Sequence, residues 1–185
     1  MKEVFLFLAE GFEETEAVGT IDVLRRGELN VAVVSISGEK TVVGAHNISV
    51  VADKLFSEVD FSTGAMLVLP GGMPGASNLN AHSSLKALIQ QYNSDGKRLA
   101  AICAAPLVFG GLGLLQGKKA IAYPGFESTL EGATVIEKAA VKDGNIITGR
   151  GPGFVIDFGL AIVEELQGKA KADEVAAGLL YQRKD

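Results

Sequence analysis

The sequence predicts an α/β fold in three layers, with helices on both faces of a mostly parallel sheet. Short runs of branched apolar residues alternate with amphipathic helical segments along the chain, which is the pattern of right-handed strand–helix–strand units. Several of the runs are apolar at successive positions, as expected of strands that are covered on both faces. A length of 185 residues suits one compact domain over residues 1–185.

Five strands, four helices and one hairpin account for these patterns. The strands are expected at residues 4–8, 30–36, 65–69, 99–102 and 145–148. The helices are expected at residues 14–26, 83–95, 154–166 and 172–180. The first three helices end at or near a glycine, which suits a helix stop. Residues 41–53 break the alternation and predict a small β-hairpin excursion from the main sheet.

Composition and charge exclude several classes of protein. Apolar residues make up 48% of the chain and charged residues 21%, which rules out whole-chain disorder. The net charge is −5, and no run of Lys or Arg forms a positively charged surface that could bind the phosphates of a nucleic acid. No nucleic-acid partner is therefore expected. The first apolar run is too short for a signal peptide, and the apolar uncharged stretch of residues 99–115 holds a proline and three glycines. No membrane segment is expected. A single cysteine cannot form an internal disulfide, and a reducing, cytoplasmic location is expected.

Glycine is over-represented, with 23 of 185 residues, and much of the surplus falls in turns that follow predicted strands. These turns are residues 9–16, 70–75, 103–106, 123–125 and 149–153. In open parallel sheets the functional crevice lies beyond the carboxyl ends of the strands. The five turns are therefore the candidate site.

Cys103 follows a predicted strand and precedes Pro106, which fits the first turn of a helix. This is the arrangement of a nucleophile elbow, although Ala101 and Ala105 replace the two glycines of the G-x-S-x-G form. Free N–H groups and a helix dipole at such a position favour a thiolate. The residues alone leave a second interpretation, an inert core thiol, because free cysteine is among the most buried residue types.

Three acids, Glu13, Glu14 and Glu16, follow the first strand at the start of the first helix. Acids there are favoured by the helix dipole, and for two of the three a solvent-facing position is expected. A carboxyl group that reaches the thiol would differ, because two anions in contact in a poorly hydrated cleft cannot both persist. Such a pair would share a proton and titrate as a coupled unit.

Other turns supply possible donors and bases. The N–H groups of Gly71 and Gly72, with that of Ala104, would suit an oxyanion hole, and a plain turn is the alternative. The chain has two histidines, His46 and His82, and the spacing places neither beside Cys103. No motif for zinc, a nucleotide or another cofactor is present. Residues 149–153 would suit an anion before a helix, but a tight structural turn is favoured.

Six ordered blocks of the sequence resemble the ThiJ/PfpI superfamily, in the branch of the parkinsonism-associated protein deglycase and its bacterial relatives. The blocks are residues 11–16 (GFEETE), 21–27 (IDVLRRG), 69–72 (LPGG), 100–106 (AAICAAP), 149–153 (GRGPG) and 158–164 (FGLAIVE). The resemblance makes Cys103 the nucleophilic, oxidation-prone cysteine of that family and Glu16 the protonated carboxyl that contacts it. It makes Gly72 and Ala104 the backbone donors around the thiol. It also implies a flavodoxin-like fold, a single domain akin to class I glutamine amidotransferases, and a homodimer.

Activities attributed to this family include glutathione-independent conversion of methylglyoxal to lactate, repair of glycated adducts, redox sensing and chaperone function. The resemblance favours a cysteine-dependent enzyme without a cofactor or metal that acts on reactive dicarbonyls or their adducts, so its substrate would be a small carbonyl compound. A non-catalytic redox sensor or chaperone is the alternative. A cysteine peptidase and a flavin-binding module are less favoured.

The sequence departs from the family pattern at three positions. Tyr123 stands where the eukaryotic branch has a histidine, so no Cys–His pair is carried over, although the tyrosine hydroxyl could bind a substrate. Ala104 stands where the peptidases of the superfamily have a histidine, which argues against peptidase activity. His46 stands where relatives carry an arginine near the dimer partner's cleft, and an exposed hairpin position is the favoured interpretation.

Overall fold

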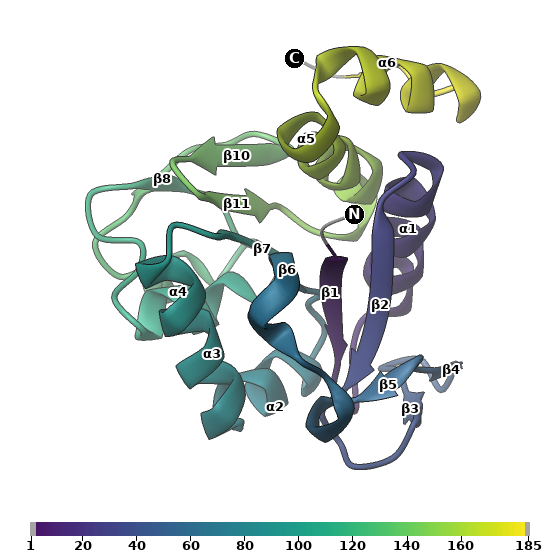
Figure 1. The fold of residues 1–185 in the computed structure, drawn as a ribbon. Helices are drawn as coiled ribbons and strands as arrows, with labels where there is room; N and C mark the ends of the chain where they lie inside the picture. The colour runs from purple at the N-terminus through teal and green to yellow at the C-terminus, as the bar shows by residue number, and fades with distance from the viewer. Residues whose placement is uncertain (1–2, 184–185) are drawn as a thin grey trace.

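The computed structural model describes residues 3–183. Within this range seven strands form one sheet in the order β10-β11-β7-β6-β1-β2-β5 (Figure 1). All neighbouring pairs are parallel except β10 with β11. The strands are β1 (Glu3–Leu8), β2 (Asn30–Ser35), β5 (Lys54–Leu55), β6 (Gly64–Leu69), β7 (Arg98–Ile102), β10 (Ala140–Asp143) and β11 (Ile146–Gly149).

Helices cover both faces of this sheet, which confirms the predicted three-layer α/β class. They are α1 (Glu14–Arg26), α2 (Gly75–Ala81), α3 (Ser83–Ser94), α4 (Pro106–Gly111), α5 (Val155–Gln167) and α6 (Lys169–Gly178). Helices α1 and α5 pack against each other on one face, and α2, α3 and α4 lie on the other (Figure 1). The contact between α1 and α5 is close, because a Cβ on Gly159 would lie 2.7 Å from Val23.

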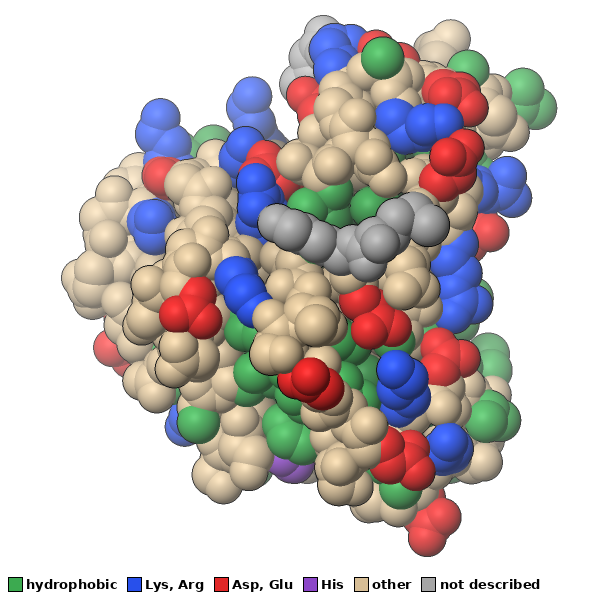
Figure 2. Space-filling view, in the orientation of Figure 1, with side chains coloured by type: hydrophobic (Ala, Val, Ile, Leu, Met, Phe, Trp, Pro, Cys, Tyr) green, Lys and Arg blue, Asp and Glu red, His purple; other side chains and the backbone are tan. Residues whose placement is uncertain are grey.

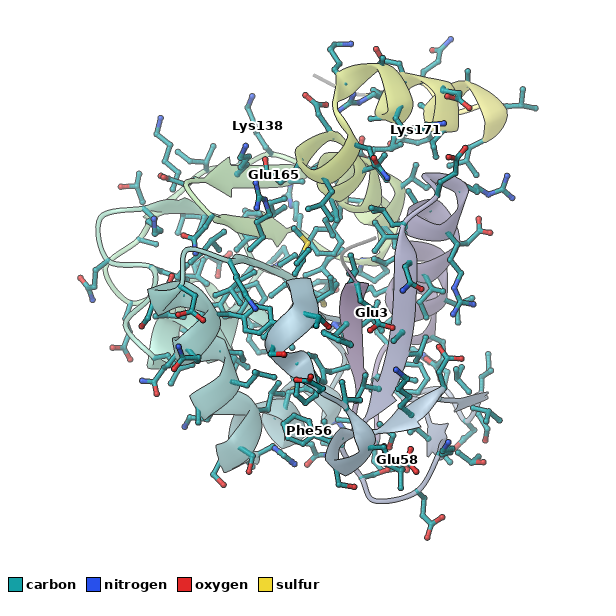
Figure 3. The ribbon with its side chains drawn as sticks, in the orientation of Figure 1. Glu3, Phe56, Glu58, Lys138, Glu165 and Lys171 are labelled. Atoms are coloured by element: carbon teal, nitrogen blue, oxygen red, sulfur yellow. The ribbon has the colours of Figure 1, made fainter. Side chains whose placement is uncertain are left out.

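The central strands are apolar on both faces because helices cover both. All six residues of β6 are buried, as are five of the six in β1. Ion pairs hold helix α5 to the sheet. They lie at the end of the sheet opposite to the glycine-rich turns. Glu165, labelled in Figure 3, binds Arg98 at 2.7 Å and also Lys142, which ties α5 to β7 and β10.

Two small sheets lie outside the main one. The hairpin expected within residues 41–53 is present as the antiparallel pair β3 (Thr41–Val43) and β4 (Ser49–Val51). The parallel pair β8 (Lys119–Ala120) and β9 (Thr134–Val135) was not predicted, and neither was the antiparallel edge strand β10. The last helix begins at Lys169 rather than at residue 172.

Charged side chains of both signs are mixed on the surface, as expected of a sequence without a run of Lys or Arg. Acidic and basic side chains are interspersed over the face shown in Figure 2. No described helix has both the length and the apolar character needed to cross a membrane.

Candidate active site

Cys103 lies in a strained turn between β7 and α4. Its φ is +64°, a left-handed conformation that residues with a side chain rarely adopt. The Cys103 N–H donates to the carbonyl of Gly149 at 2.9 Å, and the Tyr123 N–H donates to the Cys103 carbonyl at 2.8 Å. The side chain is only 7% exposed. The turn expected of a nucleophile elbow is therefore present, and two neighbouring segments hold its backbone.

Glu16, in the first turn of α1, is completely buried beside this turn. Its Oε2 accepts the Gly71 N–H at 2.8 Å, and its carboxyl is in contact with the Cys103 thiol. The Glu16 backbone is fixed as well, because its N–H donates to the carboxylate of Glu13, the N-cap of α1, at 2.7 Å. The structure thus brings together the acid and the thiol that the family resemblance paired.

Gly71 and Gly72 allow the turn after β6 to approach both residues. A Cβ on Gly71 would lie 2.6 Å from the Cys103 Cβ and 2.7 Å from Glu16 Oε2. Gly72 has a φ of +88°, and a Cβ there would lie 2.4 Å from the Glu13 nitrogen. These distances leave no room for a side chain. The N–H groups of Gly72 and Ala104 lower the pKa of the Cys103 thiol, whereas the Gly71 N–H is used by Glu16.

Gly71→Ala is expected to lower the free energy of unfolding by about 1–3 kcal/mol, because the new methyl group overpacks the contact between Cys103 and Glu16. Chemical denaturation of the two proteins measures the difference. Gly111→Ala is the matched control, since a Cβ there would meet nothing within 4 Å. Equal destabilisation of both variants would contradict the tight fit assigned to Gly71.

Burial raises the pKa of Glu16 to about 7, and it outweighs the Gly71 hydrogen bond, which lowers this pKa. The pKa of Cys103 is raised to about 12, first by burial and then by the charge and hydrogen bond of Glu16, against the N–H groups of Gly72 and Ala104. This is opposite to the lowered thiol pKa expected from a helix N-terminus. Two of the three causes that raise it come from ionised Glu16, so protonation of Glu16 removes them. The two groups therefore titrate as a coupled pair, which loses one of its two protons around pH 7 and keeps the other mainly on the thiol.

Glu14 is buried, with 7% of its surface exposed. The sequence had predicted that two of the three acids face solvent, and for Glu14 this prediction is wrong. Its Oε1 accepts the N–H of His46 at 2.6 Å and of Ile48 at 3.4 Å, and its Oε2 lies 2.8 Å from His46 Nδ1. These bonds lower the pKa of Glu14 and raise that of His46. The His46 side chain is 70% exposed, at the tip of the hairpin as predicted. The acid therefore fastens the β3–β4 hairpin to the start of α1.

Glu14→Ala is expected to loosen this hairpin selectively. Loss of bonds to a charged acceptor is worth about 1.5 kcal/mol or more, so amide exchange at His46 and Ile48 should accelerate by roughly tenfold or more. Hydrogen exchange followed by NMR measures the rates. Glu39→Ala, a change at an exposed residue near the same hairpin, is the control and should leave them unchanged. Equal rates in wild type and Glu14→Ala would show that the backbone bonds of the hairpin suffice.

One group of described residues has the spacing of metal ligands. Ligand atoms of Glu13, Glu14 and His46 lie within 4.8 Å of one another. Each is already engaged, because Glu13 caps α1 and Glu14 binds the hairpin and the imidazole. The arrangement is accounted for as a structural clamp.

The remaining candidates have structural positions. His82 is the N-cap of α3, and its Nδ1 accepts the Leu85 N–H at 3.1 Å, as expected of a histidine at a helix start. The turn at residues 149–153 supplies the carbonyl that binds the Cys103 N–H, in agreement with a structural turn. Tyr123 is 45% exposed, and its ring would lie 3.0 Å from a Cβ on Gly151. Sequence reasoning named the Gly71 N–H as a donor but not its partner Glu16. It did not find the contacts of Cys103 with the Gly149 carbonyl and the Tyr123 N–H, because main-chain groups leave no residue signature.

Comparison with known proteins decides the family. The model of the DJ-1/PfpI family matches residues 2–165. This chain belongs to the DJ-1/PfpI family. It is 45% identical over 184 residues to Protein DJ-1 homolog A of Arabidopsis thaliana, covering 98% of this chain and 47% of that protein. It is 39% identical to Protein dj-1beta of Drosophila melanogaster, covering 97% of each.

DJ-1 structures also match the fold. An oxidized DJ-1 of Toxoplasma gondii superposes with a TM-score of 0.95 at 38% identity, covering 99% of this chain and 100% of that one. The flavodoxin-like α/β fold and the predicted resemblance are thereby confirmed. The chain spans a little under half the length of the Arabidopsis DJ-1 homologue, whereas it matches nearly all of the fly and parasite proteins.

Proposed function

We propose that this protein is a cysteine-dependent enzyme, without a cofactor, that acts on reactive dicarbonyls such as methylglyoxal or on their adducts. The observation that carries the proposal is the buried contact between Cys103 and Glu16, next to the N–H groups of Gly72 and Ala104. A nucleophile, a proton carrier and two donors for a developing oxyanion are the groups that addition to an aldehyde requires.

The proposed reaction begins with transfer of the thiol proton to the Glu16 carboxylate as the Cys103 sulfur adds to the aldehyde carbon. The carbonyl π electrons pass to oxygen, the N–H groups of Gly72 and Ala104 stabilise the oxyanion, and Glu16 returns the proton to it. Glu16 then takes the proton from C1 of the hemithioacetal, which gives an enediolate, and delivers it to C2. As the hydroxyl proton passes from the C1 oxygen to the C2 oxygen, the C1 carbonyl forms and a lactoyl thioester results. Water cleaves the thioester to lactate and the free thiol. Methylglyoxal and one water are consumed, and no oxidant or reductant is needed.

Incubation of the purified protein with methylglyoxal tests this proposal directly. Lactate, measured by an enzymatic assay after quenching, should form at a rate proportional to protein concentration, also in the presence of a metal chelator. Heat-denatured protein is the control for spontaneous conversion. Lactate formation no faster than in that control would refute the proposed reaction.

Redox sensing is a second candidate, favoured by the same donors. A Cys103 thiolate that takes one oxygen from each of two hydrogen peroxide molecules becomes a sulfinate and releases two waters. The N–H groups of Gly72 and Ala104 and a protonated Glu16 would hold the sulfinate oxygens. Intact-mass analysis after mild peroxide should show a gain of two oxygens that is lost in Cys103→Ala. Oxidation confined to methionines would exclude this role.

The surface supports a homodimer of the kind common in the DJ-1/PfpI family. Apolar side chains are exposed on α1 and on the hairpin fastened to it; they are Val18, Val43, Ile48 and Val51. We place the second copy of the chain on this patch. Val51 is 69% exposed, so Val51→Lys should leave the fold intact and shift the mass measured by light scattering toward the monomer. An unchanged dimer would exclude this patch as the interface.

We also propose that residues 1–185 work as one domain in a reducing, cytoplasmic compartment. The match to nearly the full length of the fly protein supports the first point, and a lone reactive thiol suits the second.

A further inference from the structure

Thr20, in the second turn of α1, carries a buried hydroxyl without a partner. The residue is 1% exposed, and its Oγ1 makes no hydrogen bond to any of residues 3–183. A threonine inside a helix commonly donates to the carbonyl four residues earlier, and here that bond, to the Glu16 carbonyl, is not made. Buried hydroxyls without a partner are rare, and an ordered water usually serves them.

Glu16 Oε1 is the other buried side-chain oxygen that lacks a hydrogen-bond partner among the described residues. The two orphaned oxygens belong to residues four apart in the same helix, whose side chains are neighbours with Cβ atoms about 5–6 Å apart. Both residues belong to the buried side of α1, together with Ala17 and Leu24.

We infer that a buried water molecule joins Thr20 Oγ1 to Glu16 Oε1 and makes Thr20 a positioning residue for the Glu16 carboxyl. The Thr20 hydroxyl donates to the water, and the water donates to Oε1. The Gly71 N–H already holds Oε2, so both oxygens of the carboxyl are then anchored. Each oxygen has two lone pairs, and the contact with the Cys103 thiol is kept.

The bridge acts on the charge of Glu16 as well as on its orientation. Three other groups act on this carboxyl: Glu13 from α1, Cys103 from the end of β7 and the Gly71 N–H from the end of β6. A water that donates to Oε1 stabilises the ionised carboxyl and opposes burial and Glu13. Its role in turnover rests on the proposed function, because there Glu16 must both take and return a proton.

Thr20→Val tests the bridge, because valine has nearly the shape of threonine and lacks the hydroxyl. Infrared difference spectra of protein labelled with ¹³C-glutamate, recorded over a pH series, follow the C=O stretch of the protonated carboxyl. Glu16→Gln identifies the Glu16 band. Loss of a hydrogen bond to the charged carboxyl should raise the midpoint of this band by about one pH unit in Thr20→Val.

Two matched variants control the measurement. Thr20→Ser keeps the hydroxyl and should keep the wild-type midpoint. Thr15→Val makes the same chemical change at an exposed position of the same helix and should also leave it unchanged. A wild-type midpoint in Thr20→Val, or an equal shift in Thr15→Val, would overturn the inference.

A crystal structure of the wild-type protein decides the question if Thr20→Val does not fold. Water density within hydrogen-bond distance of both oxygens supports the bridge, and a direct bond from Thr20 to the Glu16 carbonyl, without such density, overturns it. The infrared titration uses no substrate. A protein that shows the Thr20 shift but makes no lactate would therefore refute the proposed function and leave the bridge intact.

Discussion

Cys103→Ser is expected to lower kcat/KM for lactate formation from methylglyoxal by roughly a thousandfold or more, the scale seen when a nucleophile is removed. A serine hydroxyl holds its proton far more tightly than a thiol, and a carboxylate is too weak a base to remove it. No histidine compensates in the described chain, because His46 is bound to Glu14 and His82 caps α3. Initial rates over a substrate series, measured with a lactate assay, give the ratio.

The loss of activity can be assigned to the missing thiol only if the Cys103→Ser variant folds. Serine replaces one atom of Cys103, so the urea midpoint of the variant should stay close to that of wild type. A serine variant that folds and still turns over methylglyoxal at the wild-type rate would move the reaction away from Cys103. Parallel loss of activity and of stability would assign the effect to folding instead.

Glu16→Gln is expected to remove a pH dependence of stability of about 3 kcal/mol. The pKa of Glu16 rises from an ordinary 4.5 to about 7 in the folded protein, so the native state binds the Glu16 proton more tightly than the unfolded state. The stabilisation from this proton is fully present below about pH 4.5 and is lost as the pH rises through about 7. Glutamine resembles the protonated acid at every pH and loses nothing over that range.

Urea unfolding of wild type and Glu16→Gln from about pH 4 to about pH 8 measures the difference between their free energies of unfolding. That difference should move in favour of the glutamine variant as the pH rises. Subtraction removes the contribution of the other titrating groups. Glu137→Gln, at an exposed position, is the control and should show no such trend. A difference that stays constant with pH would mean that folding does not shift the pKa of Glu16.

The layers of the fold could be predicted from periodic patterns, and the pairing of Glu16 with Cys103 from the resemblance to a known family. Runs such as β6, apolar at nearly every position, predict a buried parallel strand, and Pro106 marks the start of a helix after Cys103. Glu14 was misjudged because a helix N-terminus favours an exposed acid as much as a buried one. The partner that decides its burial, the hairpin around His46, lies 32 residues further along the chain.

The short strands and the direction of the Cys103 pKa shift could not be predicted from the sequence, because both depend on contacts between distant segments. Strands β8 and β9 have two residues each, too few for a periodic signal, and their pairing depends on how the loops fold back. The direction of the Cys103 pKa shift depends on a balance between burial and Glu16, which raise the pKa, and two N–H groups, which lower it. A helix-dipole argument describes only one side of that balance. The orphaned hydroxyl of Thr20 likewise becomes visible only when the burial of this side of α1 is known.

At position 103 the left-handed backbone favours glycine for stability, whereas the proposed chemistry requires the cysteine thiol. Glycine adopts a φ of +64° without strain and would relieve a cost of order 1 kcal/mol or more that the cysteine imposes. A selection for heat resistance alone would therefore favour glycine over cysteine at this position. The selected proteins would be more stable and would lack the thiol. The residue is kept against the preference of its own backbone. Stabilising this scaffold for practical use thus requires that position 103 be held fixed while the rest of the chain is varied.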